Sequence, residues 1–208
     1  MASILIHLAV GKKLNEKLQK KEEPFLTGCI APDLAKFVGL SRKVSHFQDN
    51  DSNYDLERFL VKYHDYMNND YVLGYYVHLY TDYLWYKYFS SEIMDENTVT
   101  RLDGSKYRCV SENMAKLYLY NDYKTMSLDL INEYGLDLEF LYKNEYYANN
   151  IITEIPYDQI HILIDSTVEI LNKQKDRIPF VFDFEQVKNF IDIIIDYIIA
   201  NLKENKLI

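Results

Sequence analysis

The sequence predicts an all-α fold, a single-domain bundle of about seven to nine helices spanning residues 1–208. Apolar residues recur every three to four positions in one segment after another, and no alternating strand pattern of any length appears. Only four prolines and six glycines interrupt the chain, so long helices can run without breakers. With 48% hydrophobic residues, the chain can bury one sizeable core.

The first helix is expected over residues 4–19, with Ser3 as its N-cap. Its inward stripe includes His7 and Gly11 at helical spacing. The stripe therefore directs an imidazole toward the core.

The segment that follows, up to Asn53, is expected to be loop-rich apart from one short helix that begins at Pro24. Pro32 disfavours a helical backbone at the residue before it, so the short helix should end in a turn there. Asp33 is accordingly expected on a loop.

The rest of the chain is predicted to be helical, apart from a polar loop at residues 95–108. Asp70 is a plausible N-cap for the most apolar of these helices, and Gly135 is a plausible stop signal. The expected helices cover residues 54–68, 70–89, 109–120, 123–134, 136–149, 157–173 and 184–203.

The apolar stretch near the C-terminus, "FIDIIIDYIIANL", is broken by Asp192 and Asp196. It is shorter than the roughly 20 apolar residues that a membrane span needs. An amphipathic helix packed on the core is therefore expected, with no transmembrane segment.

The net charge of −9 and the pI of about 5.0 argue against binding nucleic acid through its phosphates. Cys29 and Cys109 are too few for a disulfide framework, and no signal-peptide pattern precedes the first helix. A cytoplasmic protein is expected. The tyrosine-rich helices leave a homo-oligomer open.

The segment "GYYVHLYTDYLW" is nearly apolar all round, which is typical of a buried helix. His78 and Asp82 lie four residues apart and share one face of it. An isolated buried charge costs several kcal/mol, so the two must pair or bind something. Gly74, one turn earlier, is expected to leave room for a loop or ligand above His78.

Two interpretations of the His78 and Asp82 pair remain open. The pair alone favours a simple hydrogen-bonded couple inside the core. The additional presence of His7, Asp33 and His46 favours a metal site, because imidazole nitrogens and carboxylate oxygens are the ligands expected for zinc or another transition metal.

The motifs "IHLAVG", "GCIAPDL", "SHF" and "LGYYVHLYTDYLW", within roughly the first ninety residues, together resemble the zinc-dependent phospholipase C family, particularly its short, signal-less bacterial members. The resemblance implies a phospholipase C/nuclease-like helical bundle. It implies one metal held by Asp33, His46, His78 and Asp82, and another held by His7 with a shared Asp82. It also implies that Asp33 orients or deprotonates the attacking water.

The sequence departs from the family pattern at three places, one of which is that the later histidine and glutamate of the secreted members, four residues apart, have no counterpart soon after. The secreted members carry a further histidine six residues after the helix aspartate, where this chain has Tyr88. Their mature N-terminal tryptophan, whose amine binds metal, is absent, and Ala2 lies only five residues before His7. One divalent metal, zinc or another transition metal, is therefore expected, a second is possible, and a full three-metal site is not expected.

The expected function is that of a metal-dependent hydrolase, a phosphoesterase that uses metal-activated water on a small-molecule or lipid phosphodiester. The alternative is a non-catalytic binding or structural module that keeps the fold. An enzyme needs an open cleft beside the metal, whereas a structural site is closed by four protein ligands.

A second alternative is a helical phosphohydrolase of the HD type, which would use His46, His64, Asp65 and Asp122. Helical geometry argues against it, since Asp65 lies roughly 180° from the apolar stripe of its helix and should face solvent. Asp122 falls at an expected helix junction, where the role of N-cap is preferred over that of metal ligand.

Three further residues are weaker candidates. His161 and Asp165 repeat the four-residue spacing and could add ligands for a second metal, but a surface or boundary pair is the better interpretation. Cys29 could be a nucleophile beside His46, although nothing supports this beyond the presence of both residues.

Overall fold

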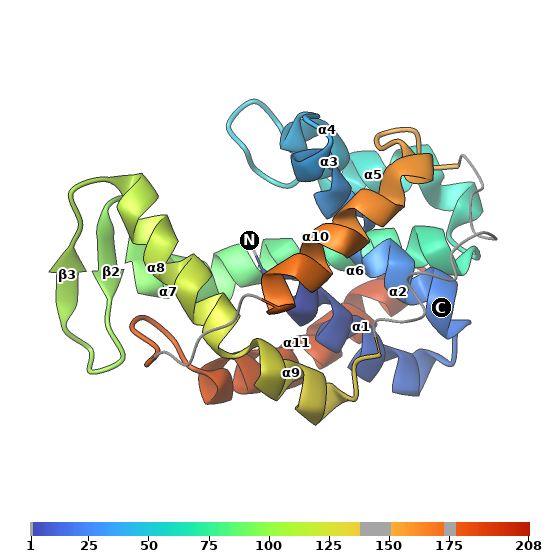
Figure 1. The fold of residues 1–208 in the computed structure, drawn as a ribbon. Coiled ribbons are helices and arrows are strands. Elements are labelled where there is room, and N and C mark those ends of the chain that lie inside the picture. Colours follow the sequence, from blue (N-terminus) through green and yellow to red (C-terminus); the bar gives the residue numbers. More distant parts are fainter. Residues whose placement is uncertain (1, 138–150, 173–177) are drawn as a thin grey trace.

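The computed structural model describes residues 2–137, 151–172 and 178–208. Over these residues the chain is mostly helical, with one small sheet, which confirms the predicted helical class (Figure 1). The helix predicted for residues 136–149 lies almost entirely outside the described residues.

The helices follow the predicted order, with shifted boundaries. The α-helices are α1 (Ile4–Leu18), α2 (Glu22–Ile30), α3 (Leu34–Phe37), α4 (Arg42–Ser45), α5 (Leu56–Tyr63), α6 (Asp70–Trp85), α7 (Ser91–Ile93), α8 (Glu112–Thr125), α9 (Ser127–Tyr134), α10 (Ile160–Asn172) and α11 (Phe184–Glu204). Short 3-10 turns cover Ala31–Asp33, His64–Tyr66 and Tyr157–Gln159, and a π-helical turn, Tyr86–Ser90, continues α6.

The expectation of no strands was wrong for the polar stretch after α7. Strands β1 (Met94–Asp95), β2 (Thr98–Thr100) and β3 (Lys106–Arg108) form an antiparallel sheet in the order β1-β2-β3. β2 and β3 lie beside α8 at one end of the molecule (Figure 1). Strands of two or three residues are too short to show alternation in the sequence, and hence periodicity missed them.

Several helix ends confirm the expected capping chemistry. Ser3 accepts a hydrogen bond from the backbone of Ile6, and Gly135 ends α9 in the left-handed conformation at φ 56°. The predicted cap of α6 was one residue off, since Asn69, not Asp70, accepts hydrogen bonds from the first-turn backbone.

Asp33 does not lie on a loop, contrary to prediction. It ends the 3-10 turn between α2 and α3, with Pro32 near the start of that turn. A proline costs little there, because the first N–H groups of a helical turn have no partner within the turn. The chain therefore stays helical and holds the Asp33 backbone firmly.

The buried centre of the molecule is α6, along which α2 packs. Two glycines allow the contact. A Cβ atom on Gly28 would lie 2.1 Å from the carbonyl oxygen of Tyr71, and one on Gly74 would lie 2.1 Å from that of Phe25. Gly74 therefore makes room for the backbone of α2, so of the two predicted occupants, a loop or a ligand, the space beside Gly74 is taken by a chain segment, which is helical.

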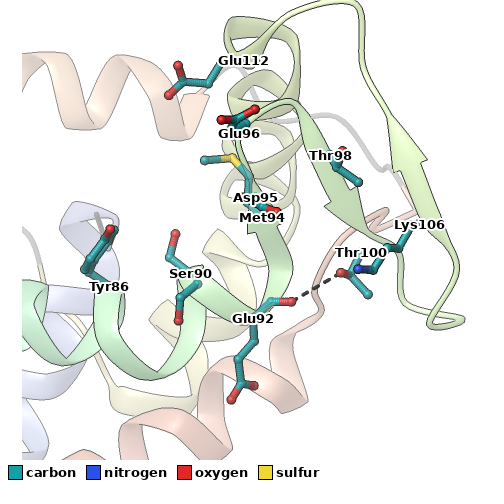
Figure 2. Close-up of a pocket in the computed structure, with 11 residues that line it drawn as sticks. Tyr86, Ser90, Glu92, Met94, Asp95, Glu96, Thr98, Thr100, Lys106 and Glu112 are labelled. Atoms are coloured by element: carbon teal, nitrogen blue, oxygen red, sulfur yellow. Dashed lines mark hydrogen bonds between the residues drawn. The ribbon is translucent and has the colours of Figure 1, made fainter.

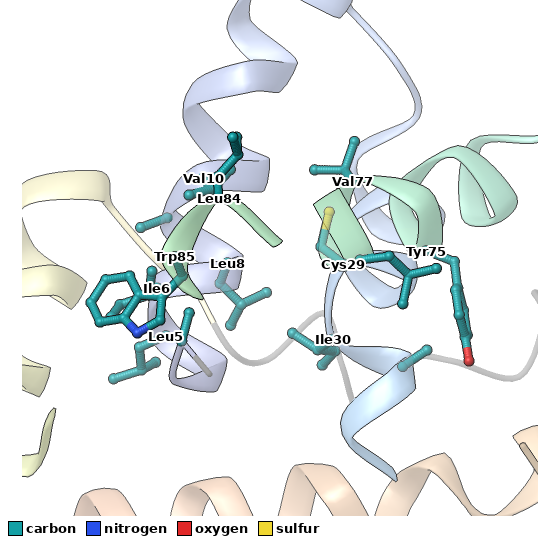
Figure 3. Close-up of a cluster of buried hydrophobic side chains, with 14 of the residues drawn as sticks. Leu5, Ile6, Leu8, Val10, Cys29, Ile30, Tyr75, Val77, Leu84 and Trp85 are labelled. Atoms are coloured by element: carbon teal, nitrogen blue, oxygen red, sulfur yellow. The ribbon is translucent and has the colours of Figure 1, made fainter. Parts of the chain in front are cut away.

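Apolar side chains from α1, α2 and α6 fill the space around this contact (Figure 3). They include Ile6, Leu8, Ile30, Tyr75, Leu84 and Trp85.

The C-terminal helix α11 lies against α1 and adds its apolar face to the core. Its Asp192 and Asp196 pair with Lys13 and Lys17 of α1 at the surface. The amphipathic prediction for this segment is thus confirmed. No helix within the described part of the chain is long and apolar enough to cross a membrane.

We expect Gly74→Ala to destabilise the protein by at least about 1–3 kcal/mol, because the added methyl group meets backbone rather than a movable side chain. Gly11→Ala is the matched control. Its Cβ would meet only the side chains of Leu26 and Cys29, and alanine favours the helix. Urea unfolding of both variants measures the difference, and an equal cost would contradict the close α2–α6 contact.

Candidate metal centre

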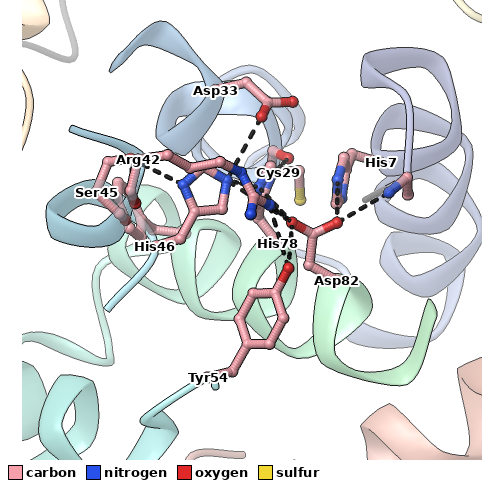
Figure 4. Close-up of polar contacts among 11 residues, drawn as sticks. His7, Cys29, Asp33, Arg42, Ser45, His46, Tyr54, His78 and Asp82 are labelled. Carbon is pink, nitrogen blue, oxygen red and sulfur yellow. Dashed lines mark hydrogen bonds and ion pairs between the residues drawn. The ribbon is translucent and has the colours of Figure 1, made fainter. Parts of the chain in front are cut away.

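Three imidazoles and two carboxylates from four segments of the chain meet at one place in the core (Figure 4). His7 comes from α1, Asp33 from the 3-10 turn after α2, His46 from the residue after α4, and His78 and Asp82 from α6. None of the five is more than 5% exposed. The structure thus brings together all five residues that the sequence singled out as principal ligands.

The segment that carries His46 is fixed to α6 by a buried hydrogen bond. Tyr75 donates its hydroxyl to the carbonyl oxygen of Ser45 at 2.6 Å. The backbone N–H of His46 donates to the carbonyl of Arg42 at 2.8 Å, which ends the short helix α4. The position of the His46 ring is therefore set by α6 itself.

The hydrogen bond of His78 fixes its tautomer. Its Nδ1 lies 2.7 Å from the carbonyl oxygen of Cys29. A carbonyl only accepts, so Nδ1 carries the hydrogen. In the neutral ring Nε2 is then a bare lone pair.

His46 is also held through its Nδ1. This atom lies 2.8 Å from Ser45 Oγ, which itself lies 3.3 Å from the carbonyl oxygen of Arg42. The Ser45 hydroxyl has one hydrogen for these two neighbours. Given to the Arg42 carbonyl, it leaves His46 with Nδ1–H and a bare Nε2. Given to Nδ1, it puts the ring hydrogen on Nε2, so that only the first arrangement leaves His46 Nε2 free to bind a metal. The Nε2 atoms of His46 and His78 are 3.1 Å apart.

Two carboxylate oxygens complete the surroundings of this nitrogen pair. His46 Nε2 lies 3.5 Å from Asp33 Oδ1 and 3.7 Å from Asp82 Oδ2, and His78 Nε2 lies 3.8 Å from the same Asp82 oxygen. Lone pairs and negative oxygens so close together repel one another unless a ring hydrogen or a cation lies among them. The separations are similar to the roughly 3.3 Å between ligand atoms that tetrahedral zinc implies for bonds of about 2.0–2.1 Å.

Protonation of His46 or His78 is not expected to supply the cation at neutral pH. Burial is the main cause that lowers the pKa of His46 and takes that of His78 well below its ordinary value. Both rings are therefore neutral, which is the form that binds a metal. The residues fit a divalent metal better than they fit a shared proton.

The two carboxylates stay ionised although burial opposes it. Against that burial, the nearby imidazoles and a hydrogen bond from His46, which requires the hydrogen of that ring to lie on Nε2, hold the pKa of Asp33 below its ordinary value. Against the same cost, His7 and Arg42 hold the pKa of Asp82 well below its ordinary value. The cluster therefore keeps two negative charges in the core.

His7 adds a second possible ligand position. Its ring stacks on that of His78 with 3.7 Å between centroids, and its Nε2 lies 3.4 Å from Asp82 Oδ1. Neither ring nitrogen of His7 has a hydrogen-bond partner among the described residues. Ala2 donates its backbone N–H to the same Asp82 oxygen at 3.0 Å. His7 and Asp82 Oδ1 could thus hold a second metal.

Sequence reasoning missed two members of the cluster, Arg42 and Tyr54. Arg42 Nη2 contacts both Asp82 Oδ2 and, at 3.2 Å, the hydroxyl of Tyr54. Tyr54 donates to Asp82 Oδ2 at 3.2 Å. The signal for Arg42 was present, since it lies four residues before His46 on the same short helical segment.

Asp122 is neither a helix cap nor a metal ligand, contrary to the two roles considered for it. It lies in the last turn of α8, which runs on to Thr125. Its carboxylate accepts the backbone N–H groups of three consecutive residues, Phe180, Val181 and Phe182, at 3.0, 2.6 and 3.2 Å. Asp122 therefore anchors the segment that leads into α11.

The structure does not bring the other candidates to the cluster. His161 and Asp165 are exposed on α10. His64 and Asp65 lie on a surface 3-10 turn with side chains 67% and 95% exposed, as helical geometry predicted for the aspartate. The HD-type arrangement is therefore not formed.

Cys29 and Tyr88 do not contribute ligands or nucleophiles. Cys29 is buried, and burial raises the pKa of its thiol, which opposes a thiolate nucleophile. Its carbonyl, not its sulfur, contacts His78. Tyr88 lies on the π-helical turn and stacks on Tyr197 of α11.

A separate cavity of about 770 Å³ lies between the π-helical turn, the sheet and α8 (Figure 2). Its lining is largely acidic and polar, and includes Glu92, Asp95, Glu96, Lys106 and Glu112. It shares no residue with the histidine cluster, and acidic side chains alone do not identify a ligand.

We expect Asp122→Ala to lower the free energy of unfolding by about 2–3 kcal/mol, because two buried N–H groups and one partly buried N–H group lose their acceptor. Thermal or urea unfolding measures this loss. Zinc affinity should not change, since Asp122 is not part of the cluster. A variant that stays stable but loses zinc would show that Asp122 is a ligand after all.

No protein-family model matches the chain, and comparisons with curated proteins and with solved structures also found no match.

Proposed function

We propose that this chain is a metal-dependent hydrolase that cleaves a phosphodiester of a small molecule or lipid. The proposal rests on the facing Nε2 atoms of His46 and His78, 3.1 Å apart and flanked by buried carboxylates. The resemblance of the surrounding motifs to zinc-dependent phospholipases C supports the choice of reaction.

The side chains of the cluster have distinct roles in this proposal. His46, His78 and Asp82 hold the metal, and Asp33 accepts a hydrogen bond from the attacking water and orients it. A bound zinc or similar divalent ion would supply Lewis acidity and lower the pKa of water to about 7. His7, facing the other oxygen of Asp82, is available for a second ion.

A closed, non-catalytic metal site is the second candidate, and one observation favours it. All five ligand candidates are at most 5% exposed, and Arg42 covers the Asp82 oxygen that faces His46 and His78. Structural zinc sites are closed in this way, whereas catalytic ones keep one position open. The two candidates agree on the metal and differ on turnover.

The first test is zinc binding to the wild-type chain and to Asp82→Asn, which keeps the size of the side chain and removes its charge. We expect about one tightly bound zinc in the wild type. The zinc affinity of the variant should fall more than roughly tenfold. Removing only the group that hydrogen-bonds to a metal ligand already lowers metal affinity by about tenfold or more, and Asp82→Asn changes the ligand itself. Elemental analysis and competition with a chromophoric chelator measure both.

Asp65→Asn is the matched control, since it makes the same chemical change on a 95% exposed side chain. It should bind zinc like the wild type. Loss of zinc in this control would support the HD-type arrangement. Equal zinc affinity in the wild type and Asp82→Asn would contradict the proposed centre.

The second test separates the enzyme from the closed site. The zinc-loaded protein should hydrolyse bis(p-nitrophenyl) phosphate, and a chelator should abolish turnover in parallel with zinc loss. Tightly bound zinc without any turnover would favour the non-catalytic candidate.

A further inference from the structure

Arg42 is the cation of the cluster that reaches toward solvent. Its side chain is 27% exposed, whereas that of Asp82, which it contacts, is fully buried. Tyr54 is only partly buried and lies between the two, donating to Asp82 and accepting from Arg42. Arg42 and Tyr54 are therefore less buried than the five ligand candidates, and both contact Asp82 Oδ2 (Figure 4).

Arg42 and a metal compete for the same atom. The Asp82 oxygen that contacts Arg42, Oδ2, is also the one nearest to the Nε2 atoms of His46 and His78. A divalent ion bound there would repel the guanidinium and would take its partner. Arg42 then needs another anion, and its exposed side allows one to approach.

The charges of the cluster indicate which anion fits. Without a metal, two carboxylates and one guanidinium leave a net charge of about −1, because metal-binding imidazoles are neutral. One divalent ion changes this to about +1. A phosphodiester carries a single negative charge and would neutralise the loaded centre.

The guanidinium also has donors to spare. Of its five N–H groups, those on Nη2 make the contacts with Asp82 and Tyr54, and the buried Nε has no partner among the described residues. The fixed fork of arginine suits two oxygens of one phosphate, which a lysine ammonium cannot match. The neighbouring Lys43 is directed elsewhere and donates to the carbonyl of Asn50.

We infer that Arg42, oriented by Tyr54, is the phosphate-binding residue at the entrance of the metal centre, and that it exchanges Asp82 for the phosphate of a phosphodiester when a metal binds. This inference rests on the proposed function and adds a specificity residue to it.

The test uses inorganic phosphate as the probe and isothermal titration calorimetry on the zinc-loaded chain. We expect Arg42→Met to bind phosphate roughly ten- to a hundredfold more weakly than the wild type, the loss typical of a charge-assisted hydrogen bond. Zinc affinity should be unchanged or higher, because the competitor for Asp82 is gone. Lys43→Met is the matched control, because it removes one positive charge from the same helix. Its phosphate affinity should stay within about twofold of that of the wild type.

The possible outcomes separate the inference from the function beneath it. Equal phosphate affinity in zinc-loaded wild type and Arg42→Met would overturn the inference alone. Loss of zinc in Arg42→Met would also overturn it, since Arg42 would then support Asp82 rather than bind a ligand. A wild type that binds no zinc would overturn the proposed function and the inference with it.

A conservative variant keeps the test decisive if Arg42→Met does not fold. Arg42→Lys retains the charge but cannot make the paired contact, so phosphate affinity should fall several-fold, with zinc affinity maintained. Undiminished phosphate affinity in Arg42→Lys would contradict a role for the guanidinium fork.

Discussion

The rest of this structure depends on two imidazole nitrogens that face each other inside the core. His78 donates from Nδ1 to the Cys29 carbonyl, which leaves its Nε2 bare and 3.1 Å from Nε2 of His46. Without a hydrogen or a cation between them the two nitrogens repel each other, and the flanking carboxylates increase the demand for a cation. The packing of the surrounding helices has to offset this repulsion in the metal-free chain.

The close contact between α2 and α6 is a main part of the packing that holds His78 in place. Gly28 and Gly74 let the two backbones approach until no Cβ would fit between them. Cys29 follows Gly28 directly, and His78 lies one turn after Gly74. The glycine contact therefore brings the Cys29 carbonyl to within 2.7 Å of His78 Nδ1 and so fixes the tautomer on which metal binding depends.

The sequence predicted the helical class, the His78 and Asp82 pair and the inward-facing His7 because each leaves a local signal, whereas the assignment of Asp33 and His46 as ligands followed from the resemblance of the motifs. Helical periodicity marks α1, α6 and α11, and an ionisable pair in an apolar helix marks His78 and Asp82. Arg42 and Asp122 were not assigned correctly, since their roles depend on partners 40 and 58 or more residues away. The short strands and the 3-10 turn at Asp33 were missed because such elements are too brief to show a period.

The most direct test of the account is the response of the histidine ring nitrogens to zinc, followed by long-range ¹⁵N NMR. The chain has five histidines, of which His64 and His161 are exposed and serve as internal references. We predict that His46 and His78 are neutral Nδ1–H tautomers without zinc, and that their Nε2 resonances shift on zinc addition while the two references do not. Unchanged His46 and His78 resonances, or a protonated ring at neutral pH, would contradict a metal centre and leave a buried ion pair in its place.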